Sequence, residues 1–175
     1  GLKFRDGTEL TADVVKWSIE RVARIEGDPA WFVLDFVDHV EVVDKYTVKI
    51  VLQKPVAFYK AVLAVPTYFP ISPNSYPADR IDPDNTAGGI GPYRIVRFVR
   101  DQEIVLEANP DYYGEKPKTK KIIIKFYKDA TSLRMALEAG EIDIAWRTLN
   151  PSDIIDLKKS GKFKVIEGKG SFIRY

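Results

Sequence analysis

The chain has 175 residues, 45% hydrophobic and 30% charged, which is enough to bury a core in one domain or two small ones. Its 27 Lys and Arg against 25 Asp and Glu leave a net charge of +2, too even a balance to indicate nucleic-acid binding through charge. The lack of Cys excludes disulfides and thiolate metal sites, and a single His argues against an imidazole-rich site, so we expect no cofactor.

The N-terminal quarter predicts a strand end, a turn and a helix. Residues 1–7 are expected to finish a strand and turn at Asp6-Gly7. Thr11 is the expected N-cap of a helix, which Gly27-Asp28-Pro29 ends. One face of this helix carries apolar residues at helical spacing, namely Val15, Ile19, Val22 and Ala23.

A hairpin and an irregular crossing follow. Val40 and Val42 lead to a turn near Asp44-Lys45, after which apolar and polar residues alternate as in a half-buried strand. Pro55 predicts the first turn of a short helix that ends near Leu63. Residues 65–92 are rich in Pro, and such a long irregular segment predicts a boundary between subdomains.

The second half predicts another hairpin and two helices. Residues 93–100 and 103–108 pair across Asp101-Gln102, and residues 121–127 form a strand. Asp129 caps a helix that stops at Gly140, and residues 142–146 return as a strand, which completes a βαβ unit. Asn150-Pro151 opens a helix ending at Gly161, and residues 163–166 and 172–175 are expected to be strands.

Four short phrases occur in a fixed order along the chain. Together they resemble the peptide/nickel class of extracellular solute-binding proteins, the receptors of ABC importers. The resemblance covers nearly the whole chain and rests on Lys3-Phe4-Arg5-Asp6-Gly7-Thr8-Glu9-Leu10-Thr11-Ala12-Asp13, Gly89-Ile90-Gly91-Pro92-Tyr93, Asn109-Pro110-Asp111-Tyr112-Tyr113-Gly114 and Ala139-Gly140-Glu141-Ile142-Asp143-Ile144.

The resemblance implies an α/β fold of the periplasmic binding protein-like II type, a mixed sheet with flanking helices, present here as a partial lobe of a two-lobed receptor. Residues 1–69 would form the small extra subdomain (strand, helix, hairpin, helix). Residues 70–175 would belong to the larger lobe with the hairpin and the βαβ unit, and the other lobe would be absent. Half a cleft buries little of a ligand, so we expect the chain alone to bind solute weakly or not at all.

The function implied is delivery of oligopeptides, or of a related solute, to the membrane permease of an ABC importer, without chemistry on the solute. The receptor would be periplasmic or extracellular, with or without a lipid anchor. It would be a monomer when intact, and nucleic acid would not be a partner. The sequence does not distinguish peptide, nickel complex and sugar as solutes.

The same resemblance points to ligand-binding residues. Trp31 follows the first helix where the family carries a cleft aromatic, although a core position fits it equally well. The segment Thr67-Tyr68-Phe69 resembles the family's cleft-facing loop, with the same alternative. His39 lies within a predicted strand, where a structural role is expected.

Other readings remain open. Glu141 and Asp143 would share a strand face, as a small acidic-residue hydrolase requires, but the sequence shows no third polar partner. A stand-alone interaction module would show an exposed apolar patch. The lysines of residues 116–121 fit a solvated linker better than a nucleic-acid patch.

Overall fold

The computed structural model describes residues 1–168, and the chain divides into two compact units, Gly1–Ile124 and Lys125–Tyr175. The predicted division at residues 69 and 70 lies inside the first unit and stays a prediction. None of the helices described combines the length and apolar character needed to cross a bilayer.

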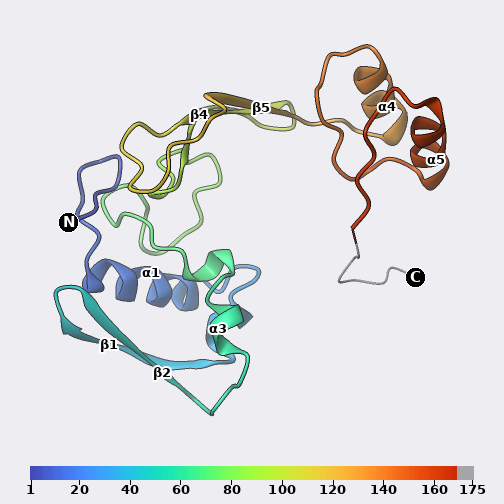
Figure 1. Ribbon diagram of the computed structural model, residues 1–175. Helices are drawn as coiled ribbons and strands as arrows, with labels where there is room; N and C mark the ends of the chain where they lie inside the picture. The colour runs from blue at the N-terminus through green and yellow to red at the C-terminus, as the bar shows by residue number, and fades with distance from the viewer. Residues whose placement is uncertain (169–175) are drawn as a thin grey trace. The chain divides into compact units, whose positions relative to one another are not determined.

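The first unit is organised around helix α1 (Ala12–Ile25), which packs against a two-stranded antiparallel sheet (Figure 1). The sheet consists of β1 (Val37–Asp44) and β2 (Thr47–Leu52), with Val40 opposite Ile50. Both the helix and the hairpin are predicted by the sequence, and the structure confirms them. The spacing of apolar residues along α1 is what turns one of its faces toward the hairpin.

The ends of α1 depend on contacts from elsewhere in the unit. Thr11 is the N-cap residue, but its side chain caps no backbone amide. The amide of Ala12 instead donates to the carbonyl oxygen of Lys45 in the hairpin turn, at 2.9 Å. The hairpin therefore supplies part of the cap that the sequence assigned to a threonine side chain. Glu26 ends the helix in the left-handed conformation, with φ 52°.

A small aromatic and aliphatic core joins these elements to three short ones. The buried residues are Ile19, Val33, Val40, Val62 and Tyr68. They come from α1, β1, α2 (Trp31–Leu34), α3 (Tyr59–Val62) and the 3-10 turn η1 (Pro66–Tyr68).

The helix predicted to start at Pro55 was wrong by one turn, since α3 begins only at Tyr59. Gln53 ties the chain to the start of the hairpin directly after β2. Its backbone amide donates to the carbonyl oxygen of Phe36 at 3.0 Å, and its side-chain amide donates to those of Leu34 and Val37.

Hydrogen bonds hold the Pro-rich segment of residues 65–92 against the N-terminal turn and against α1. Ser72 and Ser75 each donate a side-chain hydrogen bond to the carboxylate of Asp6. Arg21 on α1 donates through Nε to the carbonyl oxygen of Pro77, at 2.6 Å, and through Nη2 to that of Arg80, at 2.8 Å. Polar side chains thus hold a segment that has little regular structure of its own.

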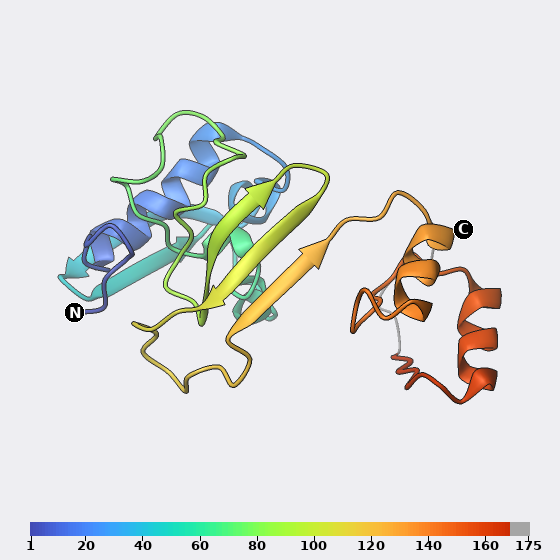
Figure 2. The ribbon, with the colours of Figure 1, turned by 90° about the horizontal axis from the view of Figure 1, so that it is seen from above.

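The crossing leads into a second sheet of the order β3-β4-β5, whose strands lie side by side in Figure 2. These are β3 (Tyr93–Val99), β4 (Glu103–Ala108) and β5 (Lys121–Lys125). The β3–β4 hairpin turns at Asp101-Gln102 as predicted, and Asp101 takes a left-handed conformation there, with φ 59°.

The second unit contains α4 (Ala130–Glu138) and α5 (Pro151–Ser160), both near their predicted bounds. The Asp129 side chain accepts from the Ser132 amide at 2.8 Å and so caps α4 as expected. At the other end, Gly140 has φ 72°, and the Glu141 amide donates to the carbonyl oxygen of Ala136 at 2.9 Å. These are the marks of a Schellman cap.

Two predicted strands are wrong. Residues 142–146 and 163–166 form no strand in the part of the chain that the structure describes, so the predicted βαβ unit is incomplete there. A strand needs a neighbour for its backbone groups, and Ile144 keeps 79% of its surface exposed. The predicted strand at 172–175 lies outside the described residues.

Candidate functional site

Trp31 lies at the start of α2, just beyond the segment that ends α1. Its indole stacks on the ring of Phe32, with centroids 3.7 Å apart and planes 26° apart. It nevertheless keeps 48% of its surface exposed. One ring face is therefore supported from within the protein while much of the indole is open to a ligand.

The residues of the segment 67–69 differ sharply in burial. Thr67 and Tyr68 are buried, whereas Phe69 keeps 54% of its surface exposed. The 3-10 turn explains the difference, because the Tyr68 amide donates to the Val65 carbonyl and the Phe69 amide to that of Pro66. This tight turn directs Tyr68 into the core and leaves Phe69 outside.

A hydrogen bond from the Tyr68 phenol links the two predicted parts of the site. It donates to the carbonyl oxygen of Phe32 at 2.6 Å, and the Tyr59 hydroxyl donates to the Tyr68 oxygen at 3.2 Å. The rings of Tyr59 and Tyr68 meet edge to face, with centroids 6.0 Å apart. Burial, together with Tyr59, raises the pKa of Tyr68 well above its usual value, so the phenol stays a neutral donor.

The four predicted residues therefore fall into two pairs. Trp31, on α2, and Phe69, directly after η1, offer exposed rings, and the two elements contact each other; Thr67 and Tyr68 lie beneath the surface. The Oγ1 atom of Thr67 is buried and has no hydrogen-bond partner within residues 1–168. Neutral aromatic surface of this kind can bind a flat or apolar part of a small molecule. Contact of any of these residues with a solute stays a prediction.

The second unit shows an exposed aromatic that the sequence analysis missed. Trp146 keeps 76% of its surface exposed, and the guanidinium carbon of Arg147 lies 4.6 Å from the centroid of its ring. Arg147 and Thr148 both take left-handed conformations, with φ 62° and 66°. Such strain in two successive non-glycine residues is a feature of functional loops. The available signal for the exposed ring was the pair Trp146-Arg147, which Thr148 and Leu149 separate from Asn150-Pro151.

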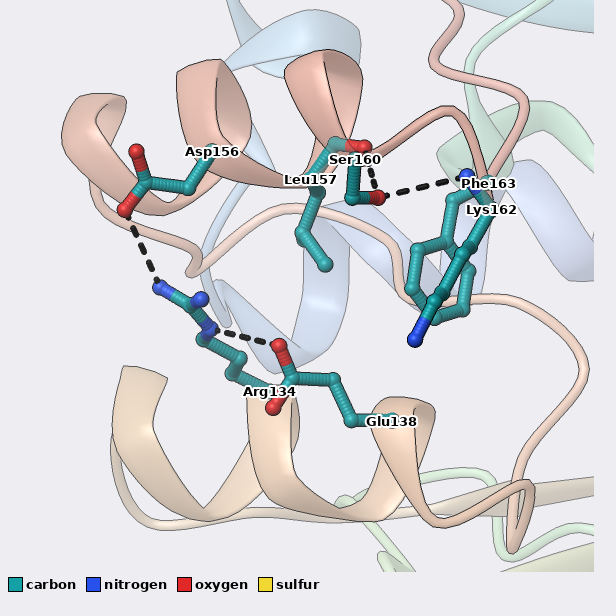
Figure 3. A pocket seen from close by; sticks show the side chains of 7 residues that line it. All are labelled: Arg134, Glu138, Asp156, Leu157, Ser160, Lys162 and Phe163. Carbon is teal, nitrogen blue, oxygen red and sulfur yellow. Dashed lines mark hydrogen bonds and ion pairs between the residues drawn. The ribbon is translucent and has the colours of Figure 1, made fainter.

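A cavity of about 360 Å³ lies between α4 and α5 (Figure 3). Among its lining residues, Arg134 contacts the carboxylates of Glu138 at 3.1 Å and Asp156 at 3.6 Å, and it also contacts Asp153 at 2.7 Å. Hydrogen bonding to Arg134 lowers the pKa of Asp153. Asp153 is therefore held as a paired carboxylate by Arg134, whereas a general acid needs a raised pKa. Leu157 and Phe163 contribute apolar side chains to the lining.

The acid pair considered for hydrolysis is not assembled. Glu141 and Asp143 are exposed, and the strand that would place them on one face is not formed within residues 1–168. Across the same part of the chain, no group of three His, Cys, Asp or Glu side chains is arranged to hold a metal ion.

Comparison with known proteins gives a family match along the full length. The sequence profile described as "Bacterial extracellular solute-binding proteins, family 5 Middle" matches residues 1–175. The "Probable D,D-dipeptide-binding periplasmic protein DdpA" of Escherichia coli is 35% identical over 172 residues, which are 94% of this chain and 33% of that protein. "Di/tripeptide-binding protein 2" of Pseudomonas aeruginosa is 26% identical, over 94% of this chain and 34% of that protein.

Solved structures show the same fold. The AgaA protein of A. tumefaciens, in complex with agropinic acid, matches with a TM-score of 0.79 and 30% identity over 90% of this chain and 32% of that one. NikA of Brucella suis, in complex with Fe(III)-EDTA, matches with a TM-score of 0.76 and 28% identity over 91% and 33%. The expected mixed α/β fold of this class is thus confirmed. The chain spans about a third of the length of the curated relatives it matches.

Proposed function

Since the chain belongs to family 5 of the bacterial extracellular solute-binding proteins, we propose that it forms part of a receptor that hands a small solute to the membrane permease of an ABC importer. The observation that carries this proposal is the family match over every residue from 1 to 175. Names of relatives support a short peptide as the solute. Two solved relatives hold agropinic acid and Fe(III)-EDTA, so a small anionic solute of another kind is the alternative to a peptide.

The proposed mechanism is binding by closure of two lobes, without a covalent step. Trp31 and Phe69 would supply aromatic contact area, while Tyr68 would hold η1 against α2 and so fix where Phe69 stands. The absence of catalysis is part of the proposal, and the paired state of the Arg134 carboxylates supports it. We further propose a monomer located in the periplasm or outside the cell.

The test uses the full-length protein and tryptophan fluorescence. Titration with a D,D-dipeptide and an L,L-dipeptide should give saturable binding, and Trp31→Ala should weaken it by about tenfold, or about 1.4 kcal/mol. Tyr113→Ala removes another exposed aromatic of the same unit and should leave the Kd within about twofold. Failure of all short peptides and small organic anions to bind would overturn the proposal.

A second measurement concerns the chain alone. Residues 1–175 should bind the same dipeptides with a Kd above about 1 mM, because one side of a cleft buries only a small part of a ligand's surface. A micromolar Kd for the isolated chain would show that it carries a complete site.

A further inference from the structure

A basic hollow lies in the first unit beside the end of β4. It has a volume of about 450 Å³, and its lining includes Lys116, Lys120 and Lys121 but only one carboxylate, that of Glu107. Glu107 is already opposed by Arg94, its register partner on β3, whose Nη2 lies 3.8 Å from Glu107 Oε2. The hollow therefore carries an excess of positive charge.

The lysines of the hollow have no ionic partner in the described structure. Across residues 1–168, no carboxylate pairs with Lys116, Lys120, Lys121 or the neighbouring Lys118. Lys116 instead donates through Nζ to the backbone carbonyl oxygens of Pro110 and Tyr112. Lysines that line one hollow without a carboxylate partner leave positive charge there, which an anion can neutralise.

The backbone that carries these lysines is held in place. The Ala108 amide donates to the carbonyl oxygen of Lys120 at 2.8 Å, and the Tyr93 hydroxyl donates to that of Thr119 at 2.9 Å. The Asn109 side chain donates to the Gly91 carbonyl oxygen at 3.0 Å. Because the loop is already ordered, an anion bound there would need little further ordering of the protein.

A simpler explanation covers only part of the pattern. Lysine on an edge strand discourages pairing with other chains, and Lys121 begins β5, an edge of its sheet. Lys116 and Lys120 lie in the loop before that strand, where no strand edge needs protection from pairing with another chain. We propose that the hollow binds a phosphate-type oxyanion, supplied either as free phosphate or as the headgroup of an anionic phospholipid.

The test compares two double variants of the full-length protein. Lys120→Gln with Lys121→Gln removes two charges at the hollow and keeps Lys116, which ties the loop. Lys54→Gln with Lys159→Gln removes two exposed charges elsewhere. The probes are inorganic pyrophosphate, followed by calorimetry, and vesicles of phosphatidylcholine with or without an equal part of phosphatidylglycerol, followed by co-sedimentation. Unfolding curves check that both variants fold.

We expect the hollow variant to lose about fivefold or more in affinity for the probe that binds, and the control variant to change by less than about twofold. Lysine-dependent binding of pyrophosphate assigns the hollow to a soluble phosphate-type oxyanion rather than to a lipid headgroup. Lysine-dependent binding to phosphatidylglycerol vesicles alone assigns it to lipid headgroups. The proposal is overturned if neither probe binds, or if both variants weaken binding equally.

Discussion

The phenol of Tyr68 donates a 2.6 Å hydrogen bond to the carbonyl oxygen of Phe32 and thereby joins η1 to α2. The two residues lie 36 positions apart, and each stands next to an exposed aromatic ring, Phe69 and Trp31 respectively. The bond thus connects the supports of the two exposed rings proposed to contact a solute.

The first prediction concerns a variant that lacks this hydrogen bond. Tyr68→Phe should lower the free energy of unfolding by about 1 to 2 kcal/mol, because the partly buried carbonyl oxygen of Phe32 loses its donor. Tyr59→Phe removes only the weaker bond to Tyr68 and should lower it by about 0.5 kcal/mol or less. Urea unfolding of both variants provides the measurement. Equal stability of Tyr68→Phe and the wild type would show that water replaces the phenol.

A second prediction separates exposed from buried residues of α2. Trp31→Ala removes a ring that is half exposed and stacked on Phe32, so the loss should stay below about 1.5 kcal/mol. Val33→Ala, in the buried core of the same helix, should lower the free energy of unfolding by about 2 kcal/mol, despite removing far fewer atoms. A loss on the order of 3 kcal/mol for Trp31→Ala would mark its ring as part of the core.

Local signals explain which elements the sequence predicts correctly. The apolar face of α1, the turn predicted near Asp44-Lys45 and found at Lys45-Tyr46, and the Asp129 cap each depend on residues within a few positions of one another. By contrast, residues 142–146 are apolar enough for a strand, but a strand also needs a partner that no local pattern supplies.

In the candidate site, too, local sequence predicts some features, and others depend on residues far apart in the chain. An exposed Trp31 is compatible with the sequence pattern, but the burial of Tyr68 depends on a carbonyl group far away in the chain. The left-handed conformations of Arg147 and Thr148 had no signal, since neither residue type favours them. Family resemblance could locate the segments, whereas the direction of each side chain required the folded core.

A third prediction concerns acid stability at Asp6. Burial alone would raise the pKa of this carboxyl, but hydrogen bonds from Ser72, Ser75 and Thr8 outweigh it and hold the pKa well below its usual range. A depressed pKa in the folded state stabilises the protein above the unfolded-state value, near 3.8, and this stability is lost as the pH falls toward the folded-state pKa.

Asp6→Asn should therefore differ most from the wild type at about pH 6, and the difference in urea midpoint should shrink by about pH 3. Asp143→Asn changes an exposed carboxyl in the other unit and should shift the midpoint little at either pH. A difference for Asp6→Asn that is the same at both values would show that charge at this position does not matter.

The last prediction concerns Arg134, which bonds Glu138 from its own helix and Asp153 from α5. Arg134→Gln leaves these carboxylates without their cation, so amide hydrogens of α4 and α5 should exchange about fivefold faster. Arg134→Lys keeps the charge but not the planar fork and should fall in between. Lys158→Gln breaks only the exposed pair with Glu167 and should change exchange by less than about twofold.

In about 1 M salt the effect of Arg134→Gln should diminish, because ions screen these charges. An effect that is independent of salt would instead assign the role of Arg134 to packing of its side-chain stem.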